Sequence, residues 1–270
     1  MKRIYIRFRA FCLQILDRIY RQKGIGVRIN GMIIKLPGRY YRYFEKDYEK
    51  ESFEFLDRTI KPGNTCIDIG AHIGIYSVYL ANLGKGRIFS FEPTPSSFST
   101  FKEVIRMNHC EDQVTASAFA IAATSGKTDF YLNSSLLPDN DATRIAEANS
   151  LVYVDFGSAR PKERIEVNTV SIDEFAQNND LKIDFIKIDA EGAELDVLQG
   201  ATKTILRDRP SGIVSVHCFA FTDRRKTLDR IWQFIQGHQL IPLSGNKELT
   251  RSMFLSCSQT DIFDFQFISR

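Results

Sequence analysis

The sequence predicts an α/β protein with a mostly parallel sheet and helices on both faces of that sheet. Between residues 64 and 238, short apolar segments alternate with amphipathic segments of roughly 10 to 15 residues, a rhythm typical of parallel strands joined by helices. Glycine or proline ends several of these segments, at Gly70, Gly84 and Pro93 for example. A chain of 270 residues is long enough for one large domain with a well-buried core.

Two elements precede the main alternation. Asn30-Gly31 stands between two apolar runs and predicts a β-hairpin over residues 27–36. Apolar residues at helical spacing then predict a helix over residues 48–60.

The remaining elements follow in chain order. The expected strands are 65–70, 86–93, 114–122, 183–189 and 212–219, and the expected helices are 73–84, 94–108, 191–207 and 223–238. The last two segments, 252–258 and 261–269, both read as strands without a helix between them. We therefore expect an antiparallel hairpin at the C-terminal edge of the sheet.

We expect two parts in the chain: an extension over residues 1–49, formed by a basic helix and the small hairpin, and a main domain over residues 50–270. Residues 1–23 carry seven lysines and arginines against one acid, with apolar residues interleaved. They form either a peripheral helix packed on its own domain or a helix lying on an anionic membrane surface. The polar segment 132–164 interrupts the alternation, and we expect either a lid over a substrate or an insertion without function.

Composition excludes several classes of protein. A net charge of +3 offers no reason to expect a general nucleic-acid binder. The five cysteines are odd in number, widely spaced and without a C-x-x-C pair, which speaks against a zinc site or a disulfide framework. We therefore expect a reducing, cytoplasmic location. No apolar run approaches the ~18 residues that a membrane span requires. Nothing in the sequence indicates an oligomeric state.

A glycine-containing turn follows the first strand of the main domain. Gly70 and Gly74 permit a tight turn and a close approach of a ligand to the backbone, and the next helix presents unpaired N–H groups. Glu92 ends the following strand, where a carboxylate can accept hydrogen bonds from both hydroxyls of a ribose. Asp68 would repel a pyrophosphate but suits a sulfonium group. We therefore expect S-adenosylmethionine rather than a dinucleotide.

A second group of charged residues lies where a later strand gives way to a helix. Asp189 ends the strand, at the ligand edge of the sheet, and Lys187 shares its face by alternation. A lysine inside a sheet needs a partner, which Asp189 or Glu191 could supply. Glu191 and Glu194 begin the expected helix, where acids also stabilise the helix dipole without any further role. His217 ends the next strand at the same edge, so it could meet Asp189 in space.

Three segments, 67–77, 91–108 and 183–201, together resemble the FkbM family of S-adenosylmethionine-dependent methyltransferases. The resemblance covers about residues 50 to 220. It implies a class I methyltransferase (Rossmann-like) fold with a mostly parallel seven-stranded sheet. It also implies methyl transfer to a hydroxyl of a sugar, a glycan or a small natural product.

The resemblance also implies roles for single residues. It implies a cofactor-binding role for Asp68, Gly70, Ala71, His72, Gly74 and Glu92. Lys187, Asp189, Glu191 and Glu194 match the charged segment of the family. His72 departs from the family pattern, which more often has asparagine, and Ala190 stands where a branched aliphatic residue is usual.

The second charged group stands where the methyl group of the cofactor would meet its acceptor. A hydroxyl is a weak nucleophile and must lose its proton as it attacks. Asp189, His217 and Glu191 are the candidate proton acceptors, favoured in that order. Lys187 would orient a carboxylate or bind an acidic sugar. A divalent metal held by Asp189 and Glu191 is an alternative, but we expect a site without metal.

Two other functions compete with methyl transfer. An NAD-dependent sugar oxidoreductase would need a third glycine in the loop and a Tyr-x-x-x-Lys pair, and the sequence contains neither. A nucleoside-binding module without catalysis could attach to membranes through the basic N-terminus. Methylation of nucleic acid is disfavoured because there is no basic stripe beyond residue 23 and no NPPY-type loop for a flipped base.

Overall fold

The computed structural model describes residues 12, 15–20, 23–41, 43–132, 149–152 and 163–270. The strands of the main sheet are β3 (Thr65–Ile69), β4 (Arg87–Phe91), β5 (Val114–Ser117), β9 (Phe185–Asp189), β10 (Ser211–His217), β11 (Leu240–Ser244), β12 (Lys247–Glu248) and β13 (Ile262–Ser269). The helices of the main domain are α2 (Lys50–Thr59), α3 (Ile75–Gly84), α4 (Pro95–Met107), α5 (Ile172–Asn178), α6 (Glu194–Gln199), α7 (Thr202–Asp208), α8 (Arg224–Gly237) and α9 (Arg251–Ser256).

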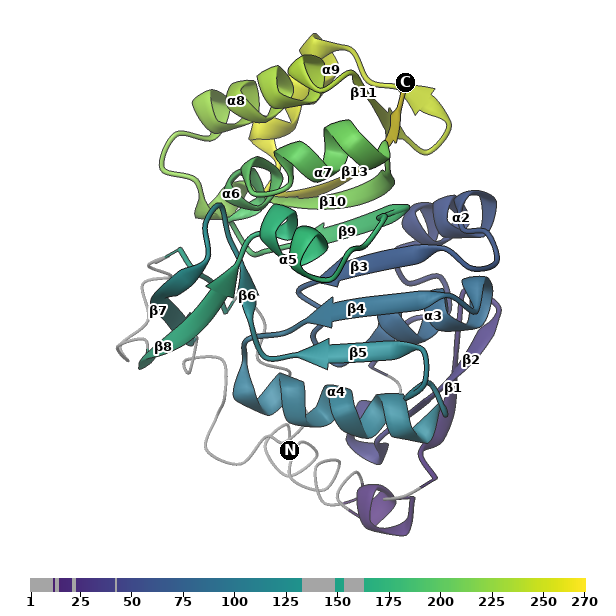
Figure 1. Ribbon diagram of the computed structural model, residues 1–270. Helices are drawn as coiled ribbons and strands as arrows, with labels where there is room; N and C mark the ends of the chain where they lie inside the picture. Colours follow the sequence, from purple (N-terminus) through teal and green to yellow (C-terminus); the bar gives the residue numbers. More distant parts are fainter. Residues whose placement is uncertain (1–11, 13–14, 21–22, 42, 133–148, 153–162) are drawn as a thin grey trace, which may run out of the picture.

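The main sheet runs in the order β12-β11-β13-β10-β9-β3-β4-β5 (Figure 1). Strands β5, β4, β3, β9 and β10 pair in parallel, and β13 pairs antiparallel with both β10 and β11. The expected α/β class with a mostly parallel sheet is therefore confirmed. The seven expected strands are joined by an eighth, the two-residue β12 at the edge.

The C-terminal region differs from the expected edge hairpin. Residues 261–269 do form an antiparallel strand, but β13 lies inside the sheet, paired on both sides. The expected strand over 252–258 is wrong: these residues form most of α9 and a short 3-10 turn. Thr250 caps α9 by accepting a hydrogen bond from the Met253 N–H, and Phe254 is fully buried. The hairpin at the edge is formed by β11 and β12 instead.

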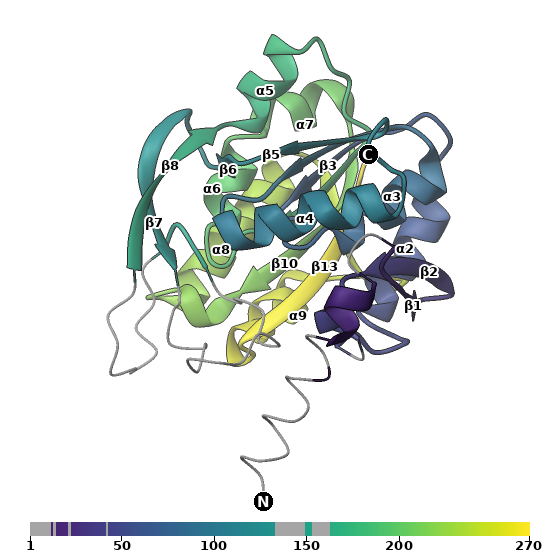
Figure 2. The same ribbon diagram turned by 90° about the horizontal axis from the view of Figure 1, so that it is seen from below.

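Each face of the sheet carries its own core. Helices α2, α3 and α4 pack on one face, while α5 to α9 pack on the other (Figures 1 and 2). Alternation along a single strand sends Ile186 and Ile188 into one core and Phe185 into the other. Strands that are buried on both faces are typical of parallel sheets.

The N-terminal hairpin forms as expected, from β1 (Ile25–Ile29) and β2 (Met32–Leu36). Its turn residues Asn30 and Gly31 both have positive φ, at 44° and 85°. The hairpin packs against α3 and α4 (Figure 2). The helix expected over 48–60 is confirmed as α2.

A second, small sheet stands beyond the carboxyl ends of β4 and β5 (Figure 1). It contains β6 (Ala120–Ile121), β8 (Glu163–Val170) and β7 (Gly126–Leu132), in that order. The single strand expected over 114–122 is therefore divided between two sheets. The division arises because β5 pairs with β4, whereas β6 pairs with β8.

The helix expected over 191–207 is also divided, into α6 and α7, and it starts three residues later than expected. Glu191 and Gly192 have φ of 50° and 105°, so neither can belong to a right-handed helix. At the break, a Cβ on Gly200 would lie 2.4 Å from the Ala122 carbonyl oxygen. The close approach of the β6 segment thus explains why the helix is interrupted at a glycine.

Two expectations fall largely outside the described residues. Residues 1–11, 13–14 and 21–22 of the basic N-terminal segment lie there, as do residues 133–148 and 153–162 of the polar segment. The membrane-surface helix and the lid therefore stay predictions. Within the described part of the chain, no helix is long and apolar enough to cross a membrane.

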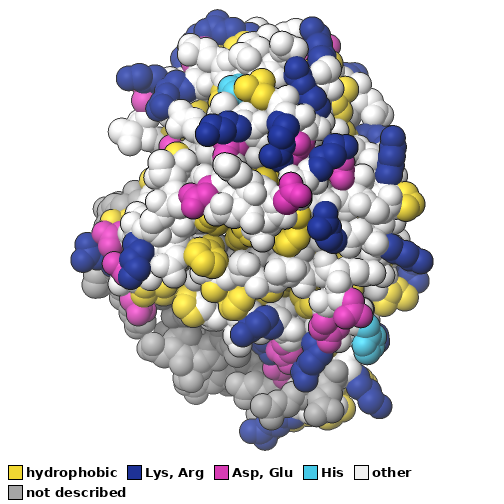
Figure 3. All heavy atoms as spheres, viewed as in Figure 1, with side chains coloured by type: hydrophobic (Ala, Val, Ile, Leu, Met, Phe, Trp, Pro, Cys, Tyr) yellow, Lys and Arg dark blue, Asp and Glu magenta, His cyan; other side chains and the backbone are white. Residues whose placement is uncertain are grey.

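Charges of both signs mix on the face shown in Figure 3. Ion pairs join Arg207 to Asp208 and Arg251 to Asp229, at 2.6 Å in each case. Such a mixture weakens any long-range positive field over this face.

Candidate active site

A cavity of about 640 Å³ opens at the carboxyl ends of β3, β4, β9 and β10. Ligands of parallel α/β sheets bind at this edge of the sheet. The volume of the cavity falls in the range of roughly 300–1,000 Å³ found for small-molecule sites. Two groups of residues contribute to its walls, although not every member faces the cavity. We call residues 70–74 with Glu92 the glycine end, and Asp189, Glu191 and His217 the histidine end.

The glycines of the glycine end are required by close contacts. Gly70 has φ of 68°, and a Cβ on it would lie 1.9 Å from the Asp189 carbonyl oxygen. Gly74 has φ of 91°, and a Cβ there would lie 2.4 Å from the Phe101 ring. A side chain at either position would collide with its neighbour, so the loop passes close to β9 at Gly70 and close to α4 at Gly74 only because both residues are glycine.

Glu92 is held by the loop beside which it lies. Its Oε2 accepts a hydrogen bond from the His72 N–H and its Oε1 accepts one from the Thr94 N–H, both at 2.8 Å. Burial raises the pKa of Glu92, although these hydrogen bonds and Lys187 oppose the shift. A carboxylate has about four lone-pair sites, so Glu92 can still accept a hydrogen bond from a ligand hydroxyl in the cavity.

Lys187 joins the two ends of the cavity from inside the protein. Its Nζ donates to the Gly70 carbonyl and to Asp189 Oδ2, both at 3.1 Å, and to the Ile69 carbonyl at 3.4 Å. Burial lowers the pKa of Lys187, but the charges of Asp189 and Asp68 outweigh it and raise the pKa. The ammonium contacts the Asp189 carboxylate, and a role in orienting that carboxylate stays a prediction. The three N–H groups of the ammonium already have acceptors, which argues against binding an acidic sugar.

Asp68 is fully buried behind the glycine end. Its Oδ2 accepts a hydrogen bond from Ser77 Oγ at 2.6 Å, and its Oδ1 lies 3.7 Å from Lys187 Nζ. Among the described residues, neither Asp68 nor Gly74 lines the cavity. The other residues expected to bind a cofactor do line it: Gly70, Ala71, His72 and Glu92. Asp68 and Gly74 thus support the loop from below.

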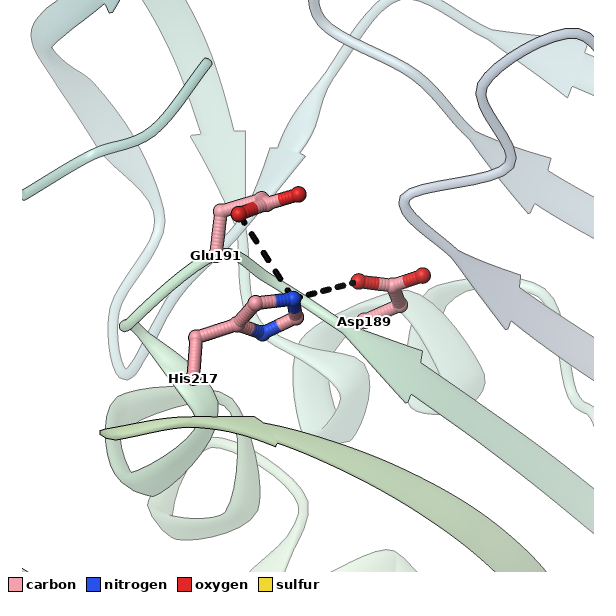
Figure 4. Close-up of side chains that lie close together, drawn as sticks. All are labelled: Asp189, Glu191 and His217. Carbon is pink, nitrogen blue, oxygen red and sulfur yellow. Dashed lines mark ion pairs between the residues drawn. The ribbon is translucent and has the colours of Figure 1, made fainter. Parts of the chain in front are cut away.

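The histidine end brings together three residues predicted from the sequence. His217 Nε2 lies 3.6 Å from Asp189 Oδ1 and 3.5 Å from Glu191 Oε2 (Figure 4). The imidazole points between the two carboxylates, which come from the end of β9 and from the turn after it. This turn explains the placement, because the left-handed backbone at Glu191 directs the chain back over the cavity rather than into a helix.

His217 is buried and surrounded by acids. Its Nδ1 lies 2.8 Å from Glu194 Oε1. Burial lowers the pKa of His217, but the hydrogen bond to Glu194 and the charges of Glu191 and Asp189 outweigh it and raise the pKa to about 10. For Asp189 the directions are reversed: burial raises the pKa of this carboxyl, but the positive charges of Lys187 and His217 outweigh burial and lower the pKa.

Glu194 belongs to this site, although the sequence alone favoured a role in the helix dipole. It is completely buried, and the same Oε1 that meets His217 also accepts from the Gly192 N–H at 2.9 Å. One carboxylate therefore fixes both the ring of His217 and the turn that carries Glu191. The match of Glu194 to the family's charged segment was the signal for this role.

Asn149 and Leu151 belong to segment 132–164, for which a lid was one expectation; the other residues of the remaining wall come from segments that sequence reasoning did not connect with the site. The N-terminal extension contributes Tyr43, Phe44, Tyr48 and Glu49, the small sheet and its connections contribute Phe119 and Phe130, and Asn149, Leu151, Phe219 and Asp264 complete the wall. Burial raises the pKa values of both Glu49 and Asp264. No periodicity or spacing in the sequence brings these segments together.

Comparisons with known proteins point to methyltransferases. A sequence model of the methyltransferase FkbM domain matches residues 68–240. The chain is 27% identical over 156 residues to methyltransferase sdnD of Sordaria araneosa, covering 50% of this chain and 59% of that protein. It is 24% identical over 158 residues to the hexuronic acid methyltransferase AglP of Haloferax volcanii, covering 58% of each. The chain thus spans less than two thirds of the length of these relatives.

Solved structures include a methyltransferase FkbM from Methylobacillus flagellatus KT. It shares 18% sequence identity with this chain at a TM-score of 0.43, covering 70% of this chain and 45% of that one.

Proposed function

The chain belongs to the methyltransferase FkbM domain family, and on that premise we propose that it is an S-adenosylmethionine-dependent O-methyltransferase. The acceptor is a hydroxyl of a sugar, a glycan or a small natural product. One observation carries the proposal: the glycine end and the histidine end line a single cavity. A methyl donor held at the first would face an acceptor held at the second.

S-adenosylmethionine binds at the glycine end in this proposal. Glu92 accepts hydrogen bonds from the ribose hydroxyls, and Gly70 lines the cavity as well. Ala71 and His72 form the adjoining wall. Asp189 also lines the cavity, and its negative charge favours a sulfonium.

The reaction is an in-line displacement. The acceptor oxygen forms a bond to the methyl carbon while the bond from that carbon to sulfur breaks, and S-adenosylhomocysteine leaves. The proton of the hydroxyl passes to a base, and we keep the order Asp189, His217, Glu191 as the proposal. Asp189 Oδ2 is bound by Lys187, which leaves Oδ1 facing His217. Holding both reactants in line supplies much of the rate.

The acceptor class is supported by the wall of the histidine end. Aromatic rings at Tyr43, Phe44 and Phe219 offer flat apolar surfaces beside carboxylates, a combination suited to a polyhydroxylated ring. The relative AglP acts on a hexuronic acid. A negatively charged acceptor here would meet Asp189 and Glu191, so a neutral hydroxylated acceptor fits these side chains better.

The two-part organisation of the chain remains part of the proposal. Residues 43–49 of the extension line the cavity that the domain over 50–270 forms. Leu151 and Asn149 line it as well, which supports an influence of the 132–164 segment on acceptor choice. Contact of residues 1–23 with a membrane surface and a cytoplasmic location stay predictions.

Calorimetric titration of the purified full chain with S-adenosylmethionine tests the proposal, with NAD as the control ligand. We expect micromolar binding of S-adenosylmethionine and none of NAD. Glu92→Ala should weaken binding about tenfold or more, the loss of roughly one good charged hydrogen bond. Glu166→Gln, which removes an exposed acid of β8, is the control and should leave the Kd unchanged. Absence of binding to folded protein would remove the basis of the proposal.

A further inference from the structure

The histidine end has the composition of a metal site. Asp189, Glu191 and His217 each offer one ligand atom, and these three atoms all lie within 4.8 Å of one another. We propose that they bind one divalent transition-metal ion. Two carboxylates and one imidazole suit Mn²⁺, Fe²⁺ or Zn²⁺ better than Mg²⁺, which prefers oxygen ligands alone.

The distances fit an ion better than direct contact. His217 Nε2 lies 3.5 and 3.6 Å from the two carboxylate oxygens, which is too long for good hydrogen bonds. Ligands bound at about 2.1 Å to one ion lie roughly 3 to 3.5 Å apart, so small side-chain movements suffice. Figure 4 shows the imidazole nitrogen facing the space between both carboxylates.

The histidine is oriented as in metal sites. Ligating histidines use their second nitrogen to contact a carboxylate, which fixes the ring and its tautomer. Here Nδ1 of His217 contacts buried Glu194 at 2.8 Å, and Nε2 faces Asp189 and Glu191. Glu194 Oε1 also accepts from the Gly192 N–H at 2.9 Å, so the turn that carries Glu191 is held by the same group.

A second, independent observation comes from the glycine end. His72 lines the same cavity, and its buried Nε2 has no hydrogen-bond partner within the described part of the chain. Asp189 is near enough to interact electrostatically with this imidazole. A buried nitrogen without a partner is costly unless a ligand or its bound water completes it. An ion between Asp189 and His217 would bring such a water or acceptor oxygen into the cavity.

The local charge also favours a cation. Three carboxylates, those of Asp189, Glu191 and Glu194, lie within 3.6 Å of the ring nitrogens of His217, and Asp189 also pairs with Lys187. Acids at this density are stabilised by bound cations. A proton on His217 is the rival occupant of the space between the carboxylates, and a metal titration distinguishes the two.

The ion would act on the acceptor. Three protein ligands leave open positions at which a hydroxyl oxygen can bind, and a bound ion lowers the pKa of such a hydroxyl. The acceptor would then be a molecule with adjacent oxygen donors, such as a vicinal diol. Binding of the ion rests on the geometry alone, whereas this use of it rests on the proposed function. Activation of the hydroxyl by the ion would also replace direct transfer of the hydroxyl proton to Asp189.

Titration of chelator-treated full-chain protein with MnCl₂ tests the site. Calorimetry measures the binding, and electron paramagnetic resonance measures the Mn²⁺ that stays free. We expect one ion per chain, displaced by Zn²⁺ as the order of affinities requires. Asp189→Asn and His217→Gln should each weaken binding at least tenfold, and Glu194→Gln about 10- to 100-fold. Asp264→Asn is the matched control, because Asp264 lines the same cavity outside the ligand set. It should change the Kd less than about threefold.

Two results would overturn the proposed metal site. The first is the absence of saturable Mn²⁺ binding to wild-type protein that is shown to be folded. The second is an equal loss of Mn²⁺ affinity in Asp264→Asn and Asp189→Asn, because attraction by a diffuse negative field does not depend on a particular ligand. The first uses no variant, so a misfolded substitution cannot obscure it. The titration contains no S-adenosylmethionine. Failure of cofactor binding would therefore leave the ion site standing, and failure of Mn²⁺ binding would leave the cofactor proposal standing.

Discussion

At the glycine end of the cavity the fixed polar contacts involve the main chain, whereas at the histidine end they join side chains from distant segments. The His72 and Thr94 N–H groups hold Glu92, and two glycines set the path of the loop. At the other end, His217 meets acids from β9, from the following turn and from α6. In the proposed function, the first end holds the cofactor and the second end holds the acceptor.

The largest effect is expected where the two ends are joined. Lys187→Met removes the ammonium that bonds both Gly70 and Asp189, and it leaves Asp68 buried without its counter-charge. Breaking a buried ion pair on one side costs about 3–5 kcal/mol. We expect that loss in the free energy of unfolding, measured by urea denaturation. A loss below about 1 kcal/mol would show that the two ends are stabilised independently of this lysine.

Gly70→Ala should disturb both ends almost as strongly. The added methyl group would collide with the Asp189 carbonyl oxygen, and the residue would need a left-handed backbone. Overpacking and left-handed strain together cost about 2–4 kcal/mol. We expect lower stability and loss of S-adenosylmethionine binding in calorimetry. Gly63→Ala is the control, because its φ of 85° carries the same strain with no atom within 4 Å of the new Cβ.

Glu194→Gln should separate the two ends. The substitution weakens the hold on His217 Nδ1 but does not touch Glu92 or the glycine loop. Loss of a residue that orients a site histidine typically lowers activity or metal affinity about 10- to 100-fold. Methyl transfer should fall in this range while the Kd for S-adenosylmethionine stays within about twofold of wild type. Equal loss of cofactor affinity would contradict the division of the cavity.

The smallest effect is expected far from both ends, at Asp208. Burial raises the pKa of Asp208, but hydrogen bonds from Arg207 and the Ile183 N–H outweigh it and lower the pKa. A carboxyl whose folded pKa is lowered contributes stability above its unfolded pKa, and this contribution is lost as the pH falls through the folded value. Asp208→Asn should therefore cost about 1 kcal/mol at neutral pH and progressively less below about pH 4. Urea denaturation across this pH range measures the difference, and both ligand affinities should remain unchanged.

Local patterns were sufficient for most elements and for the residues of the glycine end. The alternation of apolar and amphipathic segments predicted the parallel strands, and the positions of Gly70 and Glu92 after two of these strands marked the ligand edge. The errors fall where a distant contact overrides local preference. Residues 252–258 have a strand-like composition but form α9, because Phe254 is buried against neighbouring elements.

The sequence by itself determined the order of the strands along the chain, the chemistry of the two charged groups and their positions at strand ends. Those features depend on spacings of a few residues. Only the tertiary structure decided that β13 enters between β10 and β11, that Glu194 holds His217, and that Tyr43 and Glu49 of the extension reach the cavity. These contacts join segments far apart in the chain, and their free energy comes from burial and close packing, which a linear pattern does not specify.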